Sequence, residues 1–188
     1  MLDYSAEAAR YDETRGGLPR AEAAADAVRR LVPGGTLLDV ACGTGLVGRE
    51  LARRGLRVLG VDAAPGMARI ARGRLDVVLG DAFRLPVRDA SVGAVSTIWL
   101  LHLLPDVRPV IAECARVLRP GGVYVTTVDK CASRGRTGPS SPSDASDLVI
   151  AEALRHGLRQ DAESTFIGHG QGGPAPDPIY RLLTFTHL

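Results

Sequence analysis

The sequence predicts an α/β protein: a three-layer α/β/α domain on a doubly wound, mainly parallel sheet of seven strands. Between residues 36 and 128, short and almost continuously apolar segments alternate with segments whose apolar residues recur at helical spacing. Such strands are typical of a parallel sheet that helices cover on both faces. Near the end of the chain, two strand-like segments follow one another without a helix between them. They indicate an antiparallel ribbon at the C-terminal edge of the sheet.

Proline and glycine residues mark where the expected elements begin and end. Helices are expected over about 4–14 and 20–31, the second ended by Pro33-Gly34-Gly35. The alternating region contains expected strands at 37–40, 56–61, 75–79, 92–98 and 123–128, and expected helices from Gly45 to Gly55, from Pro65 to about Gly73, and over 106–118. A Ser-, Gly- and Pro-rich loop at 131–146 and a helix at 148–158 follow, and then strands at 163–167 and 179–187 joined by a second glycine-rich loop.

Length and composition are those of one globular domain. The 188 residues are most simply a single domain, 1–188, and the hydrophobic fraction of 45% is sufficient for a sizeable core. The net charge of +2 comes without a basic cluster, so a nucleic-acid partner is not expected. Only one of the 23 basic residues, Lys130, is a lysine.

The sequence also bears on location and metal binding. No apolar run approaches the ~18 residues of a membrane span, and the first residues show no signal-peptide pattern. The three cysteines, Cys42, Cys114 and Cys131, are odd in number and share no metal-ligand spacing. We therefore expect a reduced, cytoplasmic protein with no membrane partner and no metal site.

The most informative stretch is 36–45, Thr-Leu-Leu-Asp-Val-Ala-Cys-Gly-Thr-Gly. An apolar strand leads to Asp39, and Gly43 and Gly45 then allow the backbone to pass close to a ligand before a helix begins. The string also matches a dinucleotide-binding pattern. A carboxylate at Asp39 would repel a pyrophosphate but attract a cation, such as S-adenosylmethionine (SAM) with its sulfonium and ammonium groups. Two alternatives remain open: Asp39 only caps the turn, or the protein is an NAD-binding oxidoreductase.

These residues, with the segments 58–62, 80–83, 85–92 and 115–122, resemble the class I SAM-dependent methyltransferases, notably their small-molecule and quinone-methylating branch. The resemblance covers about residues 4–130. It implies a Rossmann-like fold, SAM as the methyl donor and S-adenosylhomocysteine (SAH) as the product. Ala41 stands where many members of the family have glycine.

The resemblance also implies which residues contact SAM. They are Tyr11 and Arg15 of the first helix; Asp39, Ala41, Gly43 and Gly45; Asp62, Ala63 and Met67; Asp81, Ala82 and Phe83; and Thr97, Ile98 and Trp99. Asp62 would accept both ribose hydroxyls, and Asp81 would accept a bond from the adenine amino group. Met67 and Phe83 would pack on the adenine. The alternatives are a helix cap for Asp62, a core position for Met67 and a turn for Asp81.

Methyl transfer requires alignment of the acceptor with the donor and, for a hydroxyl or ammonium acceptor, a base. The acceptor is expected over the carboxyl end of the strand at 92–98. His102 follows this strand and is the first candidate base, and His169 in the second glycine-rich loop is the other. His102 could instead make a structural hydrogen bond, and His169 could be merely solvated.

The expected function is methyl transfer from SAM to an oxygen or nitrogen of a small organic acceptor. The Asn-Pro-Pro-Tyr segment of adenine and glutamine methylases is absent, because that place reads Thr97-Ile-Trp-Leu100. The alternative within this fold is a protein that binds SAM without methylating. Helices within 1–32 and the segment 131–160 would cover the acceptor site. We expect that site to be rather open, or to be completed by the second subunit of a homodimer.

Overall fold

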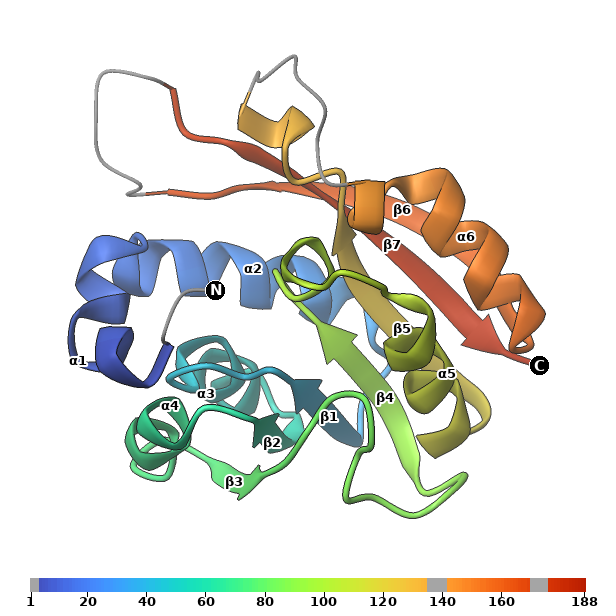
Figure 1. Ribbon diagram of the computed structural model, residues 1–188, viewed down its shortest axis with the longest axis horizontal. Coiled ribbons are helices and arrows are strands. Elements are labelled where there is room, and N and C mark those ends of the chain that lie inside the picture. Colours follow the sequence, from blue (N-terminus) through green and yellow to red (C-terminus); the bar gives the residue numbers. More distant parts are fainter. Residues whose placement is uncertain (1–3, 135–141, 170–175) are drawn as a thin grey trace.

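The computed structural model describes residues 4–134, 142–169 and 176–188, and it contains one seven-stranded sheet in the order β3-β2-β1-β4-β5-β7-β6 (Figure 1). Strands β1 to β5 pair in parallel, whereas β7 is antiparallel to both β5 and β6. The strands are β1 (Thr36–Val40), β2 (Arg57–Asp62), β3 (Asp76–Leu79), β4 (Val92–Thr97), β5 (Leu118–Val128), β6 (Leu158–Ile167) and β7 (Ile179–His187). The predicted parallel sheet with an antiparallel ribbon at its C-terminal edge is confirmed.

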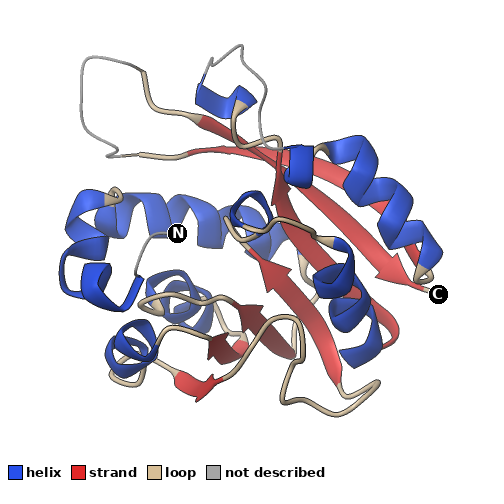
Figure 2. Cartoon of the chain, in the orientation of Figure 1, coloured by secondary structure: helices blue, strands red, loops and turns tan. Residues whose placement is uncertain are grey.

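Helices cover both faces of this sheet (Figure 2). They are α1 (Tyr4–Thr14), α2 (Gly17–Leu31), α3 (Leu46–Arg53), α4 (Pro65–Ala71), α5 (Arg108–Val117) and α6 (Ser146–Arg155), with short 3-10 turns η1 (Leu101–Leu103), η2 (Ala132–Arg134) and η3 (Pro142–Asp144). Among these helices, none has the length and apolar content needed to cross a membrane.

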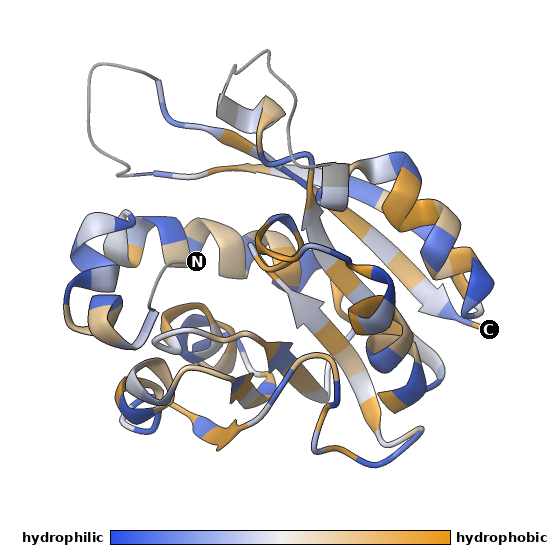
Figure 3. Ribbon diagram, viewed as in Figure 1, coloured by the Kyte–Doolittle hydropathy of each residue, from blue (hydrophilic) through white to orange (hydrophobic). Residues whose placement is uncertain are grey.

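Two hydrophobic cores lie on opposite faces of the sheet because side chains alternate along each strand. In β1, Leu37 packs with α2 and α3, whereas Leu38 packs with α5 and α6. In β5, Val123 and Val125 join the first core and Tyr124 joins the second. Figure 3 shows many apolar residues along these central strands. The sheet is therefore the middle layer of a three-layer, doubly wound domain, as predicted.

The order of the strands places a crevice beside the carboxyl end of β1. Strand β1 pairs with β2 on one side and β4 on the other, so the connections that leave β1 and β4 diverge. Helix α1 lies close to this edge and packs tightly on α4. A Cβ atom on Gly66 would lie 2.5 Å from the carbonyl oxygen of Ser5, and the Gly66 amide donates to Ser5 Oγ at 3.2 Å.

Some element limits differ from the expectations. Strand β5 begins at Leu118 because Pro120-Gly121-Gly122 lies within an irregular part of its pairing with β4. Strand β6 begins at Leu158, since its exposed first half is defined by pairing with β7. Within the segment 131–160, helix α6 packs against α5 and β6, and the expectation that the segment covers the acceptor site stays a prediction. Parts of both predicted glycine-rich loops, 135–141 and 170–175, lie outside the described residues.

Candidate functional site

The backbone after β1 makes a tight left-handed turn. Ala41, Gly43 and Gly45 have φ angles of 57°, 58° and 76°. A Cβ on Gly45 would lie 2.4 Å from the Leu75 side chain, whereas one on Gly43 would meet no atom within 4 Å. Glycine is favoured at position 45 because the positive φ strains other residues and because Ala71 and Leu75 leave little room for a side chain, whereas Gly43 presents bare backbone to open space. At Ala41 the left-handed conformation costs roughly 1–2 kcal/mol.

Two carboxylates are buried beneath this turn. Asp39, only 3% exposed, accepts a bond from Ser96 Oγ at 2.8 Å. Burial raises the pKa of Asp39 to about 6; the Ser96 bond opposes this rise, and the nearby Asp62 adds to it. Asp62 accepts bonds from the Gly43 and Ala64 amides at 2.7 and 2.8 Å. Burial also raises the pKa of Asp62, although these two bonds lower it. A cationic neighbour would stabilise the ionised form of both carboxylates.

A cavity of about 60 Å³, here called the turn cavity, opens beside Asp39 and Gly43. Seven predicted site residues line it: Tyr11, Arg15, Asp39, Ala41, Gly43, Ile98 and Trp99. Its other lining residues are Asp12, Gly17, Arg20, Ala21, Cys42, Thr44, Leu46 and Val47. The structure therefore brings the first helix and the glycine turn together, as the resemblance implies.

Three polar residues that sequence reasoning missed fasten α1 to the turn. Thr44 Oγ1 donates to Asp12 Oδ1 at 2.6 Å. Arg74 forms an ion pair with Asp12 at 2.7 Å and donates to the Thr44 carbonyl oxygen at 3.0 Å. Thr44 lies inside the glycine motif and Asp12 follows Tyr11, but nothing in the sequence links them to Arg74.

The residues assigned to the adenine by resemblance do not line the turn cavity. Asp81 Oδ1 accepts the Phe83 amide at 2.9 Å, which is a turn contact. The Phe83 side chain is exposed, and Met67 is buried. Ala82 and Ala63 lie in the same loops after β3 and β2. The contacts of these residues with adenine remain predictions.

The carboxyl end of β4 is fixed by hydroxyl groups. Thr97 Oγ1 is buried and bonds to Tyr124 Oη and Thr126 Oγ1, both at 2.7 Å. Trp99 has a φ of 59°, and its amide donates to Thr127 Oγ1 at 2.7 Å. Thr97 therefore supports the strand, while the fixed backbone of Trp99 directs its indole into the site.

A second cavity, of about 200 Å³, adjoins the turn cavity. It is here called the basic cavity, and its lining residues are Tyr4, Tyr11, Arg15, Arg20, Trp99, His102, Leu103 and Lys130. Four of these, Tyr11, Arg15, Arg20 and Trp99, also line the turn cavity. The Lys130 Nζ atom lies 2.5 Å from His102 Nε2. The first candidate base therefore faces this cavity and is paired with the single lysine.

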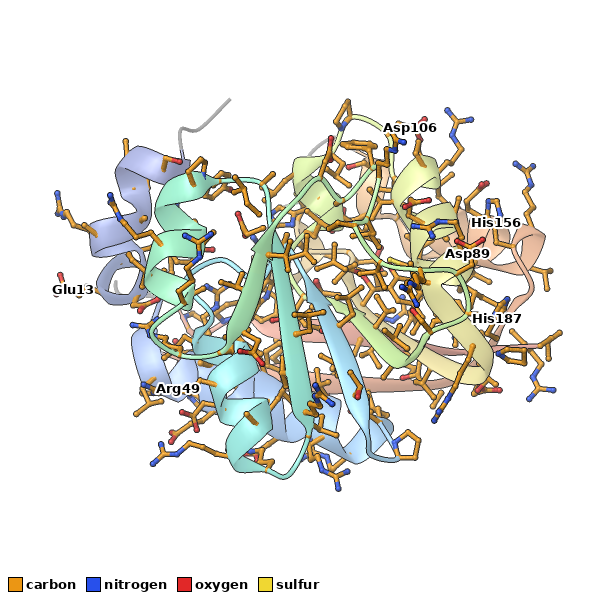
Figure 4. All side chains as sticks on the ribbon, turned by 90° about the horizontal axis from the view of Figure 1, so that it is seen from below. Glu13, Arg49, Asp89, Asp106, His156 and His187 are labelled. Carbon is orange, nitrogen blue, oxygen red and sulfur yellow. The ribbon has the colours of Figure 1, made fainter. Side chains whose placement is uncertain are left out.

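The other histidines do not line either cavity. His169 is half exposed, and its Nδ1 atom lies 3.5 Å from Asp177 Oδ2. His156 contacts Glu152, and His187 contacts the Leu118 carbonyl oxygen. Figure 4 shows His156 and His187 at the opposite end of the molecule from Glu13 of α1.

Comparison with known sequences agrees with this geometry. Residues 38–126 match the family model described as a methyltransferase domain. The chain is 40% identical over 96 residues to a malonyl-[acyl-carrier protein] O-methyltransferase of Serratia marcescens, a match that covers 50% of this chain and 38% of the relative. The chain spans less than half the length of such curated relatives.

Solved structures share the fold. A putative methyltransferase in complex with the Trm112 methyltransferase activator of Haloferax volcanii superposes with a TM-score of 0.79 at 20% identity, covering 100% of this chain and 99% of the other. The [4+2]-cyclase SpnF superposes with a TM-score of 0.75 at 20% identity, covering 97% and 93%. The methyltransferase-domain match over residues 38–126, the related sequences and the strand order all agree with the resemblance to the class I SAM-dependent methyltransferases.

Proposed function

We propose that the protein transfers a methyl group from SAM to an oxygen or nitrogen atom of a small organic acceptor. The observation that supports this most strongly is the junction of two cavities at Tyr11, Arg15, Arg20 and Trp99. One cavity has a buried carboxylate beside bare backbone, and the other contains the candidate base. A donor and an acceptor could therefore meet at the shared residues.

The residues of the turn cavity suit SAM. Asp39 is a buried carboxylate whose ionisation is opposed by burial, so a positively charged ligand would stabilise its charged form. Gly43 leaves room for a ligand against the backbone. We assign Asp39 to the charged methionine end of SAM, and Arg15 and Tyr11 to its carboxylate. Asp62 keeps free lone pairs for the ribose hydroxyls although it accepts two amide bonds.

When bound, SAM supplies a methyl group whose bonding electrons return to the sulfur as the acceptor atom takes the methyl carbon. The protein's own contribution is mainly alignment, which can lower the barrier by roughly 7–11 kcal/mol in favourable cases. Helices α1 and α2 and the turn between them supply three of the four shared lining residues, Tyr11, Arg15 and Arg20, and would exclude water, which is the lid role expected for residues 1–32.

A hydroxyl or ammonium acceptor must also lose a proton. His102 Nε2 lies 2.5 Å from Lys130 Nζ, and a neutral His102 in the tautomer that leaves Nε2 bare can accept from the lysine ammonium. To take the acceptor's proton there, His102 must exchange its bond with Lys130 for one with the acceptor. We propose His102 as the base and rank His169 below it, because His169 lines neither cavity.

The test combines binding with turnover. SAH binding is measured first by calorimetry, and the protein is then incubated with methyl-labelled SAM and a panel of phenols, carboxylic acids and amines. We expect SAH to bind and at least one acceptor to gain label. No heat from SAH at millimolar concentration would refute the proposal.

One observation favours a second candidate, a SAM-binding protein that does not methylate. A protein named as a [4+2]-cyclase has this fold, although a likeness at 20% identity shows the fold alone. SAH binding without labelling of any member of the acceptor panel would favour this candidate.

A further inference from the structure

Helix α6 presents a partly apolar face to solvent, here called the α6 face. Its exposed residues are Asp147, Leu148, Ala151, Leu154 and Arg155, and their spacing places them on one side of the helix. Leu148 is 39% exposed and Leu154 is 63% exposed. No other described helix carries two exposed large apolar side chains. None of these residues lines either cavity, so the α6 face is separate from the candidate site.

The opposite side of α6 is fixed to the domain. Val149 and Ala153 are fully buried and belong to the core on the α5 face of the sheet. The helix packs on β6 at one end of the sheet (Figure 1). At its first turn, the Ser146 amide donates to Asp129 Oδ1 at 3.0 Å, and Arg181 donates to Ser146 Oγ at 2.9 Å. The exposed leucines therefore lie on an anchored helix and not on a loop.

The sequence of the α6 face is symmetric about Ala151. Leu148 and Leu154 lie three residues before and after it, and Asp147 and Arg155 lie four residues before and after it. In two copies that pack antiparallel about a two-fold axis at Ala151, each Leu148 meets Leu154 of the partner subunit. Each Asp147 likewise meets Arg155 of the partner subunit, so the face is complementary to itself in charge. The small Ala151 allows the two helices to approach closely where they cross.

We infer that the protein forms a homodimer in which a second copy of the chain packs antiparallel on the α6 face. The inference goes beyond the proposed function and does not depend on it. Charge complementarity favours a second copy over a membrane surface, because the face carries one acidic and one basic residue and not a cluster of basic ones.

The competing explanation is that the charges serve only the helix itself. Asp147 in the first turn and Arg155 in the last turn both complement the helix dipole, and Arg155 also forms an ion pair with Glu152 at 3.2 Å. This explanation accounts for the charges but gives no reason for the exposed Leu148 and Leu154 beside them. The two explanations differ in what reversal of each charge should do to association.

The size of the α6 face determines how strong the dimer can be. A helix of 10 residues is about 15 Å long, so two such helices alone bury less than the roughly 1,600 Å² of a standard interface. We therefore expect a weak dimer whose Kd lies at or above the micromolar range.

The first experiment is sedimentation equilibrium of the full chain from micromolar to millimolar concentration. We expect monomers and dimers, with the dimer favoured as the concentration rises. Leu148→Ser and Leu154→Ser should each raise the Kd at least fivefold. Val78→Ser is the matched control, because Val78 is 41% exposed on β3 at the other end of the sheet, and it should leave the Kd unchanged.

Two results of this experiment would overturn the inference. One is a protein that stays monomeric at millimolar concentration, which would leave the α6 face to a different partner. The other is a dimer that neither leucine substitution weakens, because the contact would then lie elsewhere on the molecule.

Charge reversal then tests the antiparallel arrangement. Asp147→Arg makes both ends of the α6 face basic, and Arg155→Asp makes both ends acidic. Each variant alone should dimerise at least tenfold more weakly than wild type, because like charges meet in its homodimer. An equimolar mixture should regain the wild-type Kd, because opposite charges then meet at both ends. Damage to the helix cannot explain that recovery, and a mixture that associates no better than either variant alone would overturn the inference.

Discussion

The turn cavity and the basic cavity share four lining residues, two of them arginines, but among the described residues that line them only the turn cavity has carboxylates, Asp12 and Asp39, and the charges are supported differently. On the acidic side, Asp39 has one side-chain hydrogen bond and a second carboxylate nearby, so burial works against its ionisation. On the basic side, Arg20 stacks on Trp99 and bonds to a carbonyl oxygen. Without a ligand, the protein therefore disfavours the charged form of Asp39 in the turn cavity but stabilises the charged guanidinium of Arg20 by neighbouring groups. Removing each charge should have opposite effects on stability.

The largest expected effect is on donor binding. Asp39→Asn keeps the oxygen that accepts from Ser96 but removes the negative charge, so it should weaken SAH binding by about 3 kcal/mol, roughly 100-fold. Calorimetry measures this loss. The matched control is Asp147→Asn in α6, where the side chain accepts a bond from the adjacent Leu148 amide. Equal SAH affinities in the two variants would contradict the role of Asp39.

The same variant should stabilise the protein without ligand. The pKa of Asp39 rises from 3.8 to about 6, which corresponds to about 3 kcal/mol at neutral pH. Because the folded-state pKa is the higher one, this contribution to stability is complete below pH 3.8 and is lost as the pH rises through 6. Asp39→Asn should therefore be more stable than wild type at pH 8, with the difference disappearing toward pH 4. Urea unfolding at several pH values measures the difference in free energy of unfolding between the variant and wild type. If Asp39→Asn were less stable than wild type at pH 8, the protein would stabilise the charged form of Asp39, contrary to this expectation.

Removing a charge from the basic cavity should have the opposite effect and lower the stability of the protein. Arg20→Met preserves much of the side-chain length but removes the guanidinium from the Trp99 ring and from the Arg15 carbonyl oxygen. We expect a loss of about 1–2 kcal/mol in the free energy of unfolding. The exposed Arg57→Met in β2 is the control. If Arg20→Met instead stabilised the protein, its neighbours would not stabilise the Arg20 charge, and the contrast with Asp39 would be wrong.

Removing the bond between Thr44 of the glycine turn and Asp12 of α1 should have a smaller effect on stability. Thr44→Val is nearly isosteric and removes the bond to Asp12, so the expected loss is about 1 kcal/mol. The amides of α1 should also exchange hydrogen faster than in wild type. Thr165→Val on the exposed edge strand is the control, and unchanged exchange in α1 would show that the Thr44 bond does not hold the lid.

How much of this comparison the sequence could predict depends on how local each feature is. The strand, Asp39 and Gly43 lie within a few residues of one another, so the acidic side was readable as a pattern. The basic side was not, because Arg20, His102 and Lys130 come from α2, η1 and the end of β5. Only folding brings them together, and Lys130 was notable in sequence merely as the single lysine.

Whether a helix or strand could be predicted also depends on how local its sequence signal is. Strands β1, β2 and β4 are buried, so their apolar composition predicts them. The first half of β6 is exposed and lacks apolar alternation, and its pairing with β7 defines it instead. Helix α6 was expected as an element, but its packing against α5 and β6, away from the cavities, depends on contacts that periodicity does not contain.

The smallest predicted effect tests the backbone beneath the acidic side. Ala41 has a φ of 57°, which an alanine adopts at a cost and a glycine does not. Glycine also makes the unfolded chain more flexible, which cancels part of this gain. The net expectation for Ala41→Gly is a stabilisation of about 0.5 kcal/mol with unchanged SAH affinity. Ala90→Gly, at a φ of 48° in a surface turn, should gain a similar amount by the same mechanism. If Ala90→Gly stabilised the protein and Ala41→Gly weakened SAH binding, the Ala41 methyl group would be part of the donor contact, and the turn would select its ligand by side chain as well as by charge.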